Sequence, residues 1–419
     1  MRMPPIWRTL LWIVALAFAL RFSARWYTGN ADFWENGYTF FIELARNIAA
    51  GNGIAFDGGS PTAFRVPLYP AFLSVVTLGH EAFLPVVFWQ SLIGAGTVFC
   101  TALIAKEMFG STAAIIAAVI TAIYPYYVVH DTALQETGLY TFLTALAVFL
   151  LLQARRSGSG AMATCAGLAL GAAVLTRANL APFAILAPIW LLFPGRSWSK
   201  PPRQRLWAAA LCAATVVLTV SPWLVRSYRL NGSATLSTET GFFLWLGNNP
   251  YTFSRYPSES IDRVEEVAFE ALDPRERAEI ESLNTNEAQL DRWFLQKGLQ
   301  YIREHPWLTV GNGVRKIEAA FSLWPSPRRS FVPNLVHVLS YGPVMILGLW
   351  GMWAGRRHWR DHLIFYALFV SFGAVTAVFF GHTSYRAYLD LYWIIFAAGV
   401  LERLQREYLP NGWVRWRQA

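Results

Sequence analysis

The stretch "WRTLLWIVALAFALRFSARW" at residues 7–26, followed by "NADFWENGYTFFIELARNIAAGNG" at residues 30–53, decides what kind of protein this chain is. The first stretch is mostly apolar over the roughly 20 residues that a helix needs to cross a bilayer. No small-residue cleavage site follows it before Asp32 and Glu35, so we expect a retained membrane span rather than a signal peptide. The sequence thus places two carboxylates just beyond the end of a membrane helix.

The composition is that of a membrane protein. The chain has 419 residues, of which 55% are hydrophobic and 15% are charged, whereas soluble domains average about 25% charged residues. The net charge is +9, but the basic residues punctuate apolar runs instead of forming one basic face, which argues against a nucleic-acid partner. The three cysteines show no CxxC spacing and no nearby histidine, so neither a disulfide framework nor a zinc site is predicted.

Apolar segments recur along the chain and predict about ten transmembrane helices. They cover residues 7–26, 84–105, 112–129, 136–153, 161–176, 178–194, 206–225, 335–354, 362–380 and 386–403. Several are short, which leaves the count open by one or two. Lys and Arg concentrate in alternate connections, and the positive-inside rule then puts both termini in the cytoplasm. We expect an all-α, multi-pass protein of the inner (plasma) membrane.

Two long segments remain on the predicted outer face. Residues 1–225 form a predicted transmembrane domain whose first outer loop covers residues 27–66. Residues 226–334 are polar and predict an outer-face helical subdomain, in which Asn286 is a helix cap and Pro306 a break. Residues 335–419 supply the C-terminal transmembrane helices and a cytoplasmic tail.

The first outer loop contains a segment that is apolar on one side only. Tyr38, Phe41, Ile42, Ala45, Ile48 and Ala49 recur at three- and four-residue spacing. This pattern predicts a helix lying in the membrane interface, ended by Gly51 and Gly53. Residues 61–76 then lead back towards the bilayer through a piece too short to span it. Asp32 and Glu35 would therefore be held at headgroup depth.

Charged side chains near a membrane are costly unless they are paired or functional, so the charged residues predicted on the outer side are the candidates for chemistry. They are Asp32, Glu35, Arg65, Asp131, Glu136, Arg177, Arg226, Lys316 and Arg386, with His130 and His382. Plain structural interpretations compete. Asp131 and Glu136 could favour a helix N-terminus through its dipole, and Arg177 could snorkel. Arg386 begins a span at the end that the helix dipole disfavours for a cation, which favours an anionic partner.

The order of motifs along the chain resembles a known family. The motifs are "ENGYTFFIELARNIAAGNGI", "SPTAFRVPLYPAFLS", "AIYPYYVVHDTALQETGLYTFLTALAVFLLL", "AGLALGAAVLTRANLAPFAIL", "SPWLVRSYRLNG", "GFFLWLGNNP", "YIREHPWLTV" and "HTSYRAYLDLYWIIFAAGVL". Together they resemble the polytopic GT-C glycosyltransferases, specifically the bacterial relatives of dolichyl-phosphate-mannose protein mannosyltransferases and of the lipid A aminoarabinose transferase (glycosyltransferase family 39). Each motif alone is loose, but the series covers most of the chain.

The resemblance implies a GT-C fold and an inverting sugar transfer. Such enzymes move a sugar from a polyprenyl-phosphate donor to an acceptor hydroxyl on a lipid, glycan or protein at the outer, periplasmic face. An acid in the first outer loop acts as general base, and basic residues hold the phosphate. Asp32 and Glu35 match the loop acids by position; relatives commonly have adjacent acids, so the choice between these two stays open, with Asp32 preferred.

The remaining family roles fall on residues farther along the chain. Glu136 matches the acid that opens a later span, and Arg386 matches the basic residue of the final motif. With Arg65, Asp131, Arg177 and Lys316 they form the predicted donor phosphate and sugar site. No cofactor is implied, and carboxylates alone do not specify a divalent metal.

Elementary chemistry is consistent with this mechanism. A hydroxyl is a poor nucleophile at neutral pH, so a carboxylate should remove its proton during attack, and arginines stabilise the charge that gathers on the leaving phosphate. A transporter or flippase of a lipid-linked saccharide is the main alternative, but the chain shows neither repeated halves nor matched broken helices. A non-catalytic membrane scaffold would leave the outer acids and arginines without a common purpose.

Overall fold

Helices make up nearly all of the ordered elements in the computed structural model of this chain. It describes residues 4–31, 33–34, 38–56, 58–194, 200–284, 286–324 and 331–408. Within these ranges there is no β-strand, only an isolated bridge between Ala55 and Pro61. The predicted all-α class is therefore confirmed. The two predicted catalytic acids, Asp32 and Glu35, lie outside the described residues.

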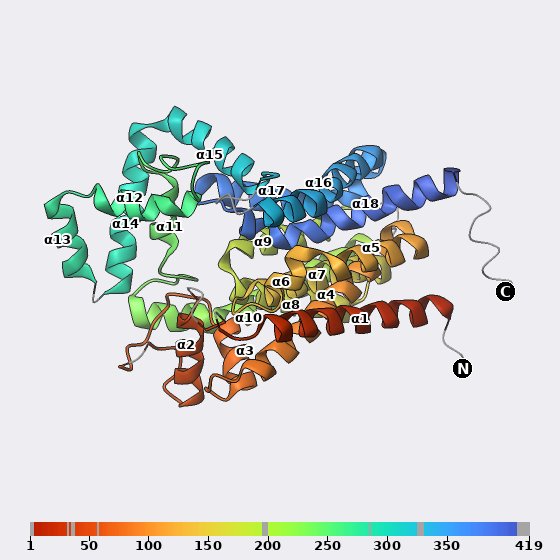
Figure 1. The fold of residues 1–419 in the computed structure, drawn as a ribbon, viewed down its shortest axis with the longest axis horizontal. Helices are drawn as coiled ribbons and strands as arrows, with labels where there is room; N and C mark the ends of the chain where they lie inside the picture. The colour runs from red at the N-terminus through yellow and green to blue at the C-terminus, as the bar shows by residue number, and fades with distance from the viewer. Residues whose placement is uncertain are drawn as a thin grey trace.

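Long apolar helices form the main bundle, in which α1, α4 and α18 run along the long axis of the molecule (Figure 1). The bundle helices are α1 (Pro5–Thr28), α4 (Phe83–Phe109), α5 (Ser111–Ile123), α6 (Pro125–His130), α7 (Thr137–Ser157), α8 (Gly160–Thr176), α9 (Ala181–Trp190), α10 (Pro202–Asn231), α16 (Phe331–Ala354), α17 (Trp359–Val378) and α18 (Ala387–Tyr408). Short 3-10 helices connect some of them: η1 (Ala178–Leu180), η3 (Gly355–His358) and η4 (Thr383–Arg386). Each apolar segment predicted from the sequence overlaps one of these helices.

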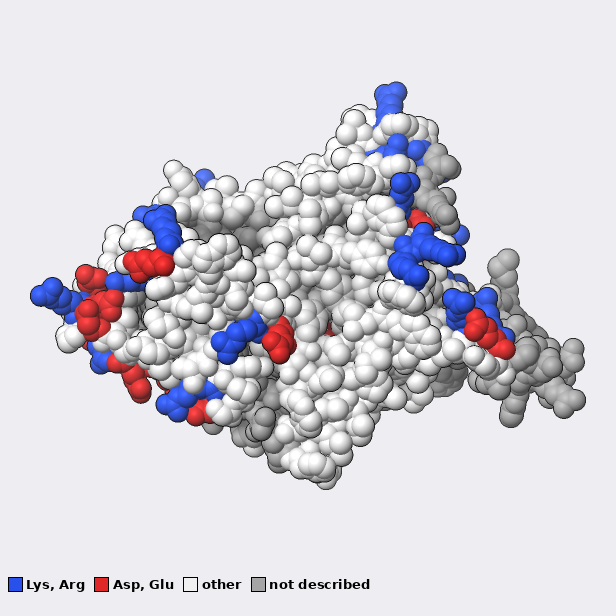
Figure 2. Space-filling model, turned by 90° about the horizontal axis from the view of Figure 1, so that it is seen from above, with Lys and Arg blue, Asp and Glu red and all other residues white. Residues whose placement is uncertain are grey.

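The bundle is built to cross a membrane. Five helical segments are long and apolar enough to do so by length and composition: Pro5–Thr28, Phe83–Phe109, Thr137–Ser157, Pro202–Asn231 and Phe331–Val378. Charged side chains gather at the two ends of the molecule and leave a broad, nearly uncharged zone between them (Figure 2). The end that carries both ends of the described chain shows mostly Lys and Arg (Figures 1 and 2). The protein is a multi-pass membrane protein, while the exact number of spans stays a prediction.

Small residues let two of these helices approach closely. Gly167 and Gly171 stand four residues apart on α8 and face α10. A Cβ atom on Gly167 would lie 2.5 Å from the carbonyl oxygen of Cys212, and one on Gly171 would lie 2.6 Å from the Cβ of Thr219. This is the small-xxx-small packing that membrane helices use in place of a hydrophobic driving force. The contact fixes α8, and with it the position at which α8 ends.

A second group of helices sits at the end opposite the termini (Figure 1). It contains α11 (Thr240–Gly247), η2 (Ile261–Arg263), α12 (Val264–Glu270), α13 (Pro274–Leu283) and α14 (Glu287–Glu304), and α15 (Pro306–Ala320) leads back from it. Aromatic packing forms its core: the ring centroid of Trp245 lies 5.3 Å from that of Phe269 and 5.0 Å from that of Phe294. Asn286 caps α14 by accepting from the backbone N–H of Gln289, and Pro306 begins α15, as predicted.

The first outer loop contributes two short helices, α2 (Phe40–Ala49) and α3 (Leu68–Thr77), which pack against each other. Phe41, Ile42 and Ala45 of α2 are buried, so the predicted one-sided helix is confirmed. The buried face differs in detail, because Asn47 is buried and Ala49 is exposed. Asn47 tolerates burial because its side chain donates to the carbonyl of Glu43 and accepts from the side chain of Asn52.

We predict that Gly167→Ala destabilises the bundle. The new methyl would meet the Cys212 carbonyl at 2.5 Å, and overpacking of this kind costs about 1–3 kcal/mol. Thermal denaturation in detergent should show a lowered midpoint. Gly311→Ala in α15 is the matched control, because a Cβ there meets nothing within 4 Å and the same exchange in an open helix position stabilises by about 0.5–1 kcal/mol. Equal midpoints for the two variants would contradict close α8–α10 packing.

Candidate active site

An ion pair joins the facing ends of α7 and α8. Glu136 directly precedes α7 and Arg177 directly follows α8, and packing of the two helices brings these residues together. The Arg177 guanidinium lies 2.8 Å from the Glu136 carboxylate, with 16% and 10% of the side chains exposed. Glu136 occupies the N-cap position of α7 but makes no capping hydrogen bond there; its carboxylate is held by Arg177. Its second oxygen, Oε2, has no hydrogen-bond donor among the described residues.

Tyrosines surround this pair. The Arg177 guanidinium lies 5.6 Å from the centre of the Tyr140 ring and 5.3 Å from that of Tyr385 in η4. Tyr38 of the first outer loop lies close enough to feel the charges of this ion pair. Burial and the Glu136 carboxylate raise the pKa of its hydroxyl, whereas Arg177 and Arg65 oppose the rise. The loop, the ends of α7 and α8, and η4 therefore converge on one place.

A second ion pair connects the first outer loop to the outer helices. Arg65 lies 2.7 Å from Glu239, which directly precedes α11. The guanidinium also lies over the Phe64 ring at 5.0 Å, with further aromatic rings near it. Burial raises the pKa of the Glu239 carboxyl to about 7; Arg65 opposes the rise, and Asp291 and Glu136 add to it. The negative charge of Glu136 is among the causes of this rise, so the two ion pairs lie near each other.

Hydrogen bonds anchor the first outer loop on both sides. Arg226, near the end of α10, donates to the carbonyl of Thr62 at 2.8 Å and to that of Ile54 at 2.7 Å. On the other side, the Glu287 carboxylate accepts from the backbone N–H of Ala63 at 3.1 Å. Arg226 thus holds the backbone of the loop at two points.

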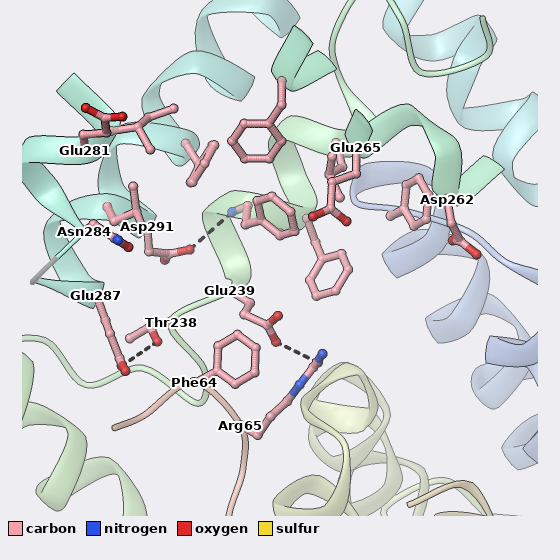
Figure 3. Close-up of a pocket in the computed structure, with 18 of the residues that line it drawn as sticks. Phe64, Arg65, Thr238, Glu239, Asp262, Glu265, Glu281, Asn284, Glu287 and Asp291 are labelled. Atoms are coloured by element: carbon pink, nitrogen blue, oxygen red, sulfur yellow. Dashed lines mark hydrogen bonds and ion pairs between the residues drawn. The ribbon is translucent and has the colours of Figure 1, made fainter. Parts of the chain in front are cut away.

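A cavity of about 750 Å³ opens next to Arg65 and Glu239 (Figure 3). Its walls come from residues 64–65, from the start of α11, from α12 to α14 and from residues near η4. Figure 3 shows the Arg65–Glu239 pair at one edge of the cavity, facing carboxylates from α12 and α14. Among the described residues, no group of three or more His, Cys, Asp or Glu side chains is placed to hold a metal ion.

Asp131 is not a member of the two ion pairs described above. Its carboxylate lies 2.8 Å from the guanidinium of Arg21 in α1, and both side chains are almost fully buried. Arg21 also donates to the carbonyl of Ala122, while Gln90 donates to the carbonyl of Asp131. The structure therefore places Asp131 in an interhelical bond. Its predicted donor-binding role lacks support from this geometry.

Lys316 is likewise occupied within the protein. Its ammonium donates to the carbonyls of Gly247 at 3.1 Å and Phe379 at 3.0 Å, and the side chain is fully buried. Burial lowers the pKa of this ammonium to about 8. The bonds tie α15 to the end of α11 and to the end of α17, directly beside Leu246 and Phe380 of the cavity lining, while Lys316 itself is not among the lining residues.

The sequence position of Arg386 at a helix start predicts an anionic partner, and the structure shows that this partner is Asp390 of the same helix region. Its guanidinium lies 3.6 Å from the Asp390 carboxylate and over the ring of Tyr341 at 3.5 Å. Tyr124 donates to the same carboxylate. Of the predicted donor-binding residues, Arg65, Glu136 and Arg177 thus form the two ion pairs described above, whereas Asp131, Lys316 and Arg386 each have another partner inside the protein. Donor binding by these six residues stays a prediction.

Sequence reasoning missed several residues of the site. The sequence pattern places Tyr38 on the apolar face of a helix, and nothing in the "HTSYRAY" motif distinguishes Tyr385 from its neighbours. Glu239 was one acid among many in the outer segment. The available signal was its position directly before the apolar run "GFFLWLG", because an acid that borders such a run is prone to burial and then needs a cation.

The converging groups have a definite chemical capacity. Two arginines on fixed carboxylates present planar guanidinium forks, which match the oxygens of a phosphate. The open oxygen of Glu136 can accept a hydrogen bond, and the tyrosine hydroxyls can donate or accept one. Such an arrangement suits an anionic group that carries a polar substituent.

Residues 65–225 match the model of the dolichyl-phosphate-mannose-protein mannosyltransferase family. This segment contains Arg65, Glu136 and Arg177, three of the residues in the two ion pairs. Among curated proteins no match is found.

Solved structures that resemble this chain include those of an oligosaccharyltransferase from Archaeoglobus fulgidus. The complex of this enzyme, AglB, with an inhibitory peptide and a dolichol-phosphate shares 16% identity at a TM-score of 0.57, covering 97% of this chain and 51% of that chain. The apo form gives a TM-score of 0.59 at the same identity and coverage. This chain therefore spans about half the length of that protein. The likeness shows the GT-C fold and confirms the resemblance to GT-C glycosyltransferases.

We predict that Arg21→Met strongly destabilises the protein, because it leaves the Asp131 carboxylate buried without its cation. Breaking a buried pair in this way costs roughly 3–5 kcal/mol. The double variant Arg21→Met with Asp131→Leu should lose less stability than the single changes added together. Denaturation in detergent of the two single variants and the double variant measures this. If Asp131→Asn kept full stability but abolished donor binding, Asp131 would belong to the site after all.

Proposed function

We propose that this chain is an integral membrane glycosyltransferase that moves a sugar from a polyprenyl-phosphate donor to an acceptor hydroxyl at the outer face of the membrane. The observation that carries the proposal is the meeting of the Glu136–Arg177 and Arg65–Glu239 ion pairs at one end of an apolar bundle. The family whose model matches residues 65–225 is named for a dolichyl-phosphate-mannose donor, which supports the same donor chemistry here.

A lipid-phosphate donor suits this position. Its polyprenyl chain would stay in the bilayer while the phosphate and the sugar stand at the surface. Arg177 and Arg65 are the proposed phosphate-binding residues, because each guanidinium is held by one carboxylate and retains further N–H groups. Glu136 and Glu239 would then be positioning acids that orient the two arginines. Asp131, Lys316 and Arg386 are proposed to act in the scaffold, where each has a buried partner.

The proposed reaction is a single displacement. Asp32 or Glu35, with Asp32 preferred, takes the proton of the acceptor hydroxyl as its oxygen attacks the anomeric carbon. The bond from that carbon to the phosphate oxygen breaks on the opposite face, so the configuration inverts. The electron pair leaves with the phosphate, and the guanidinium groups stabilise the charge that develops there. The anchored first loop would hold the base at the depth of the donor sugar.

The loop-acid assignment predicts a defined lipid phenotype. In host cells that carry Asp32→Asn with Glu35→Gln, a polyprenyl-phosphate sugar should accumulate as it does in a deletion strain, because removal of a general base slows transfer by about 10²–10⁴-fold. Mass spectrometry of membrane lipids measures the pool. Glu81→Gln, at an exposed acid paired with Arg46, is the control and should leave the pool at its wild-type level. Normal turnover in both single loop variants would refute the assignment.

The phosphate assignment predicts a selective loss of donor affinity. Arg177→Lys keeps the positive charge but removes the planar fork, so the KM for the lipid-linked donor should rise about tenfold or more, since one lost charged hydrogen bond is worth about 1.5–3 kcal/mol. The assay is transfer from the accumulating lipid by purified protein. Arg156→Lys is the control, because Arg156 pairs with Glu107 outside the site. An unchanged KM for Arg177→Lys would leave this residue a purely structural role.

A further inference from the structure

The lining of the 750 Å³ cavity is only partly explained by the donor chemistry (Figure 3). The volume lies within the range of about 300–1,000 Å³ that is usual for small-molecule sites. The cavity adjoins the proposed reaction centre, because Arg65 and Tyr385 are part of its wall and Tyr385 also contacts Arg177. Its occupant would therefore stand beside the donor phosphate.

Negative charge dominates the lining. Six acidic residues line the cavity: Glu239, Asp262, Glu265, Glu281, Glu287 and Asp291. Arg65 is the one Lys or Arg among the described lining residues, and Glu239 already holds it. Glu265 and Glu281 form no ion pair with any cation in the described part of the chain. Asp262 lies near His382 at 3.5 Å, whereas Glu265 and Glu281 are exposed and give the rim of the cavity a negative charge that no cation of the described residues pairs with.

The hydrogen-bonding capacity of the lining acids also favours a ligand that carries positive charge or donor groups. An ionised carboxylate only accepts hydrogen bonds. Backbone donors already engage Asp291, which accepts from the N–H of Gly241 at 2.6 Å, whereas Glu265 and Glu281 keep both oxygens open. A complementary ligand must therefore donate. Hydroxyl and ammonium groups do so, while a phosphate ester offers only acceptors and a peptide backbone brings as many acceptors as donors.

Aromatic rings form the other half of the wall, and one cation already rests on them. The Arg65 guanidinium lies over Phe64 at 5.0 Å and near Phe243 at 5.9 Å. Rings attract cations through their negative faces, and they also offer flat apolar surfaces to the C–H face of a sugar ring. Behind them the Glu239 carboxyl is only 7% exposed, with Arg65 as its ion-pair partner. A nearby ligand cation would stabilise its charged form.

We propose that this cavity is the acceptor site and that it selects a saccharide bearing at least one protonated amine. The sugar hydroxyls and the ammonium would donate to the open carboxylates, and the ring face would lie against the phenylalanines. A basic peptide is less favoured, because its backbone carbonyls would meet carboxylate oxygens. This inference rests on the proposed function, which supplies the need for an acceptor hydroxyl next to the donor.

Binding of two matched probes to the purified full-length protein tests the proposal. The probes are the β-1,4 tetramer of glucosamine and the tetramer of N-acetylglucosamine, which share rings and linkage and differ at the nitrogen, a protonated amine in the first and a neutral acetamide in the second. Titration calorimetry in detergent at pH 6, where the amines are protonated, should show at least tenfold tighter binding of the glucosamine tetramer. Glu265→Gln with Glu281→Gln should remove this preference by weakening that probe alone.

The double variant Glu270→Gln with Glu304→Gln is the matched control. It removes the same charge from acids of α12 and α14 that do not line the cavity, and it should keep the preference. Equal binding of the two tetramers, or no binding of either, would overturn the proposal. So would binding of trilysine in preference to the glucosamine tetramer, since this would assign the cavity to a basic peptide.

The lipid experiment separates failure of this inference from failure of the proposed function. If the polyprenyl-phosphate sugar accumulates in the loop-acid variant but the tetramers bind equally, the transferase proposal stands and the amine selectivity is wrong. If the preference depends on Glu265 and Glu281 but no carrier lipid accumulates, the cavity binds amino sugars without being an acceptor site, which contradicts the role proposed here.

Discussion

A charge removed from water must meet an opposite charge, and this constraint organises the outer end of the molecule. Glu136 and Arg177 neutralise each other where two bundle helices end, and Arg65 and Glu239 do so between the first loop and the outer helices. Each pair joins segments that are distant in the chain. The contacts that make burial tolerable therefore also fix the positions of the groups available for chemistry.

In the proposed function, both arginines would keep their carboxylate partners while they bind the donor phosphate. A guanidinium has five N–H donors in a rigid plane, so Arg177 can keep Glu136 on one edge and present another edge to a phosphate. The carboxylate then sets the direction of the fork before any donor arrives. Little reorganisation is needed as charge develops, which is the condition under which fixed dipoles and charges stabilise a transition state best.

Local patterns in the sequence predicted the helices well, but they did not predict which charged residues from distant segments form ion pairs. The apolar segments, the one-sided helix of the first loop, the Asn286 cap and the Pro306 break each depend on neighbours within about one or two helical turns. The partner of Asp131 is 110 residues away in an apolar helix, so it depends on which helices become neighbours. The role of Glu239 could not be predicted for the same reason, since its ion-pair partner, Arg65, belongs to another segment.

The joint between the first loop and the outer helices is made largely through the backbone. Arg226 holds two loop carbonyls, the N–H of Thr238 donates to the carbonyl of Ala63, and Ser237 donates to that of Phe64. Main-chain partners are the same for every residue type. The loop here can therefore change its side chains in evolution without losing its attachment, so that its surface can diverge while the membrane part keeps its architecture.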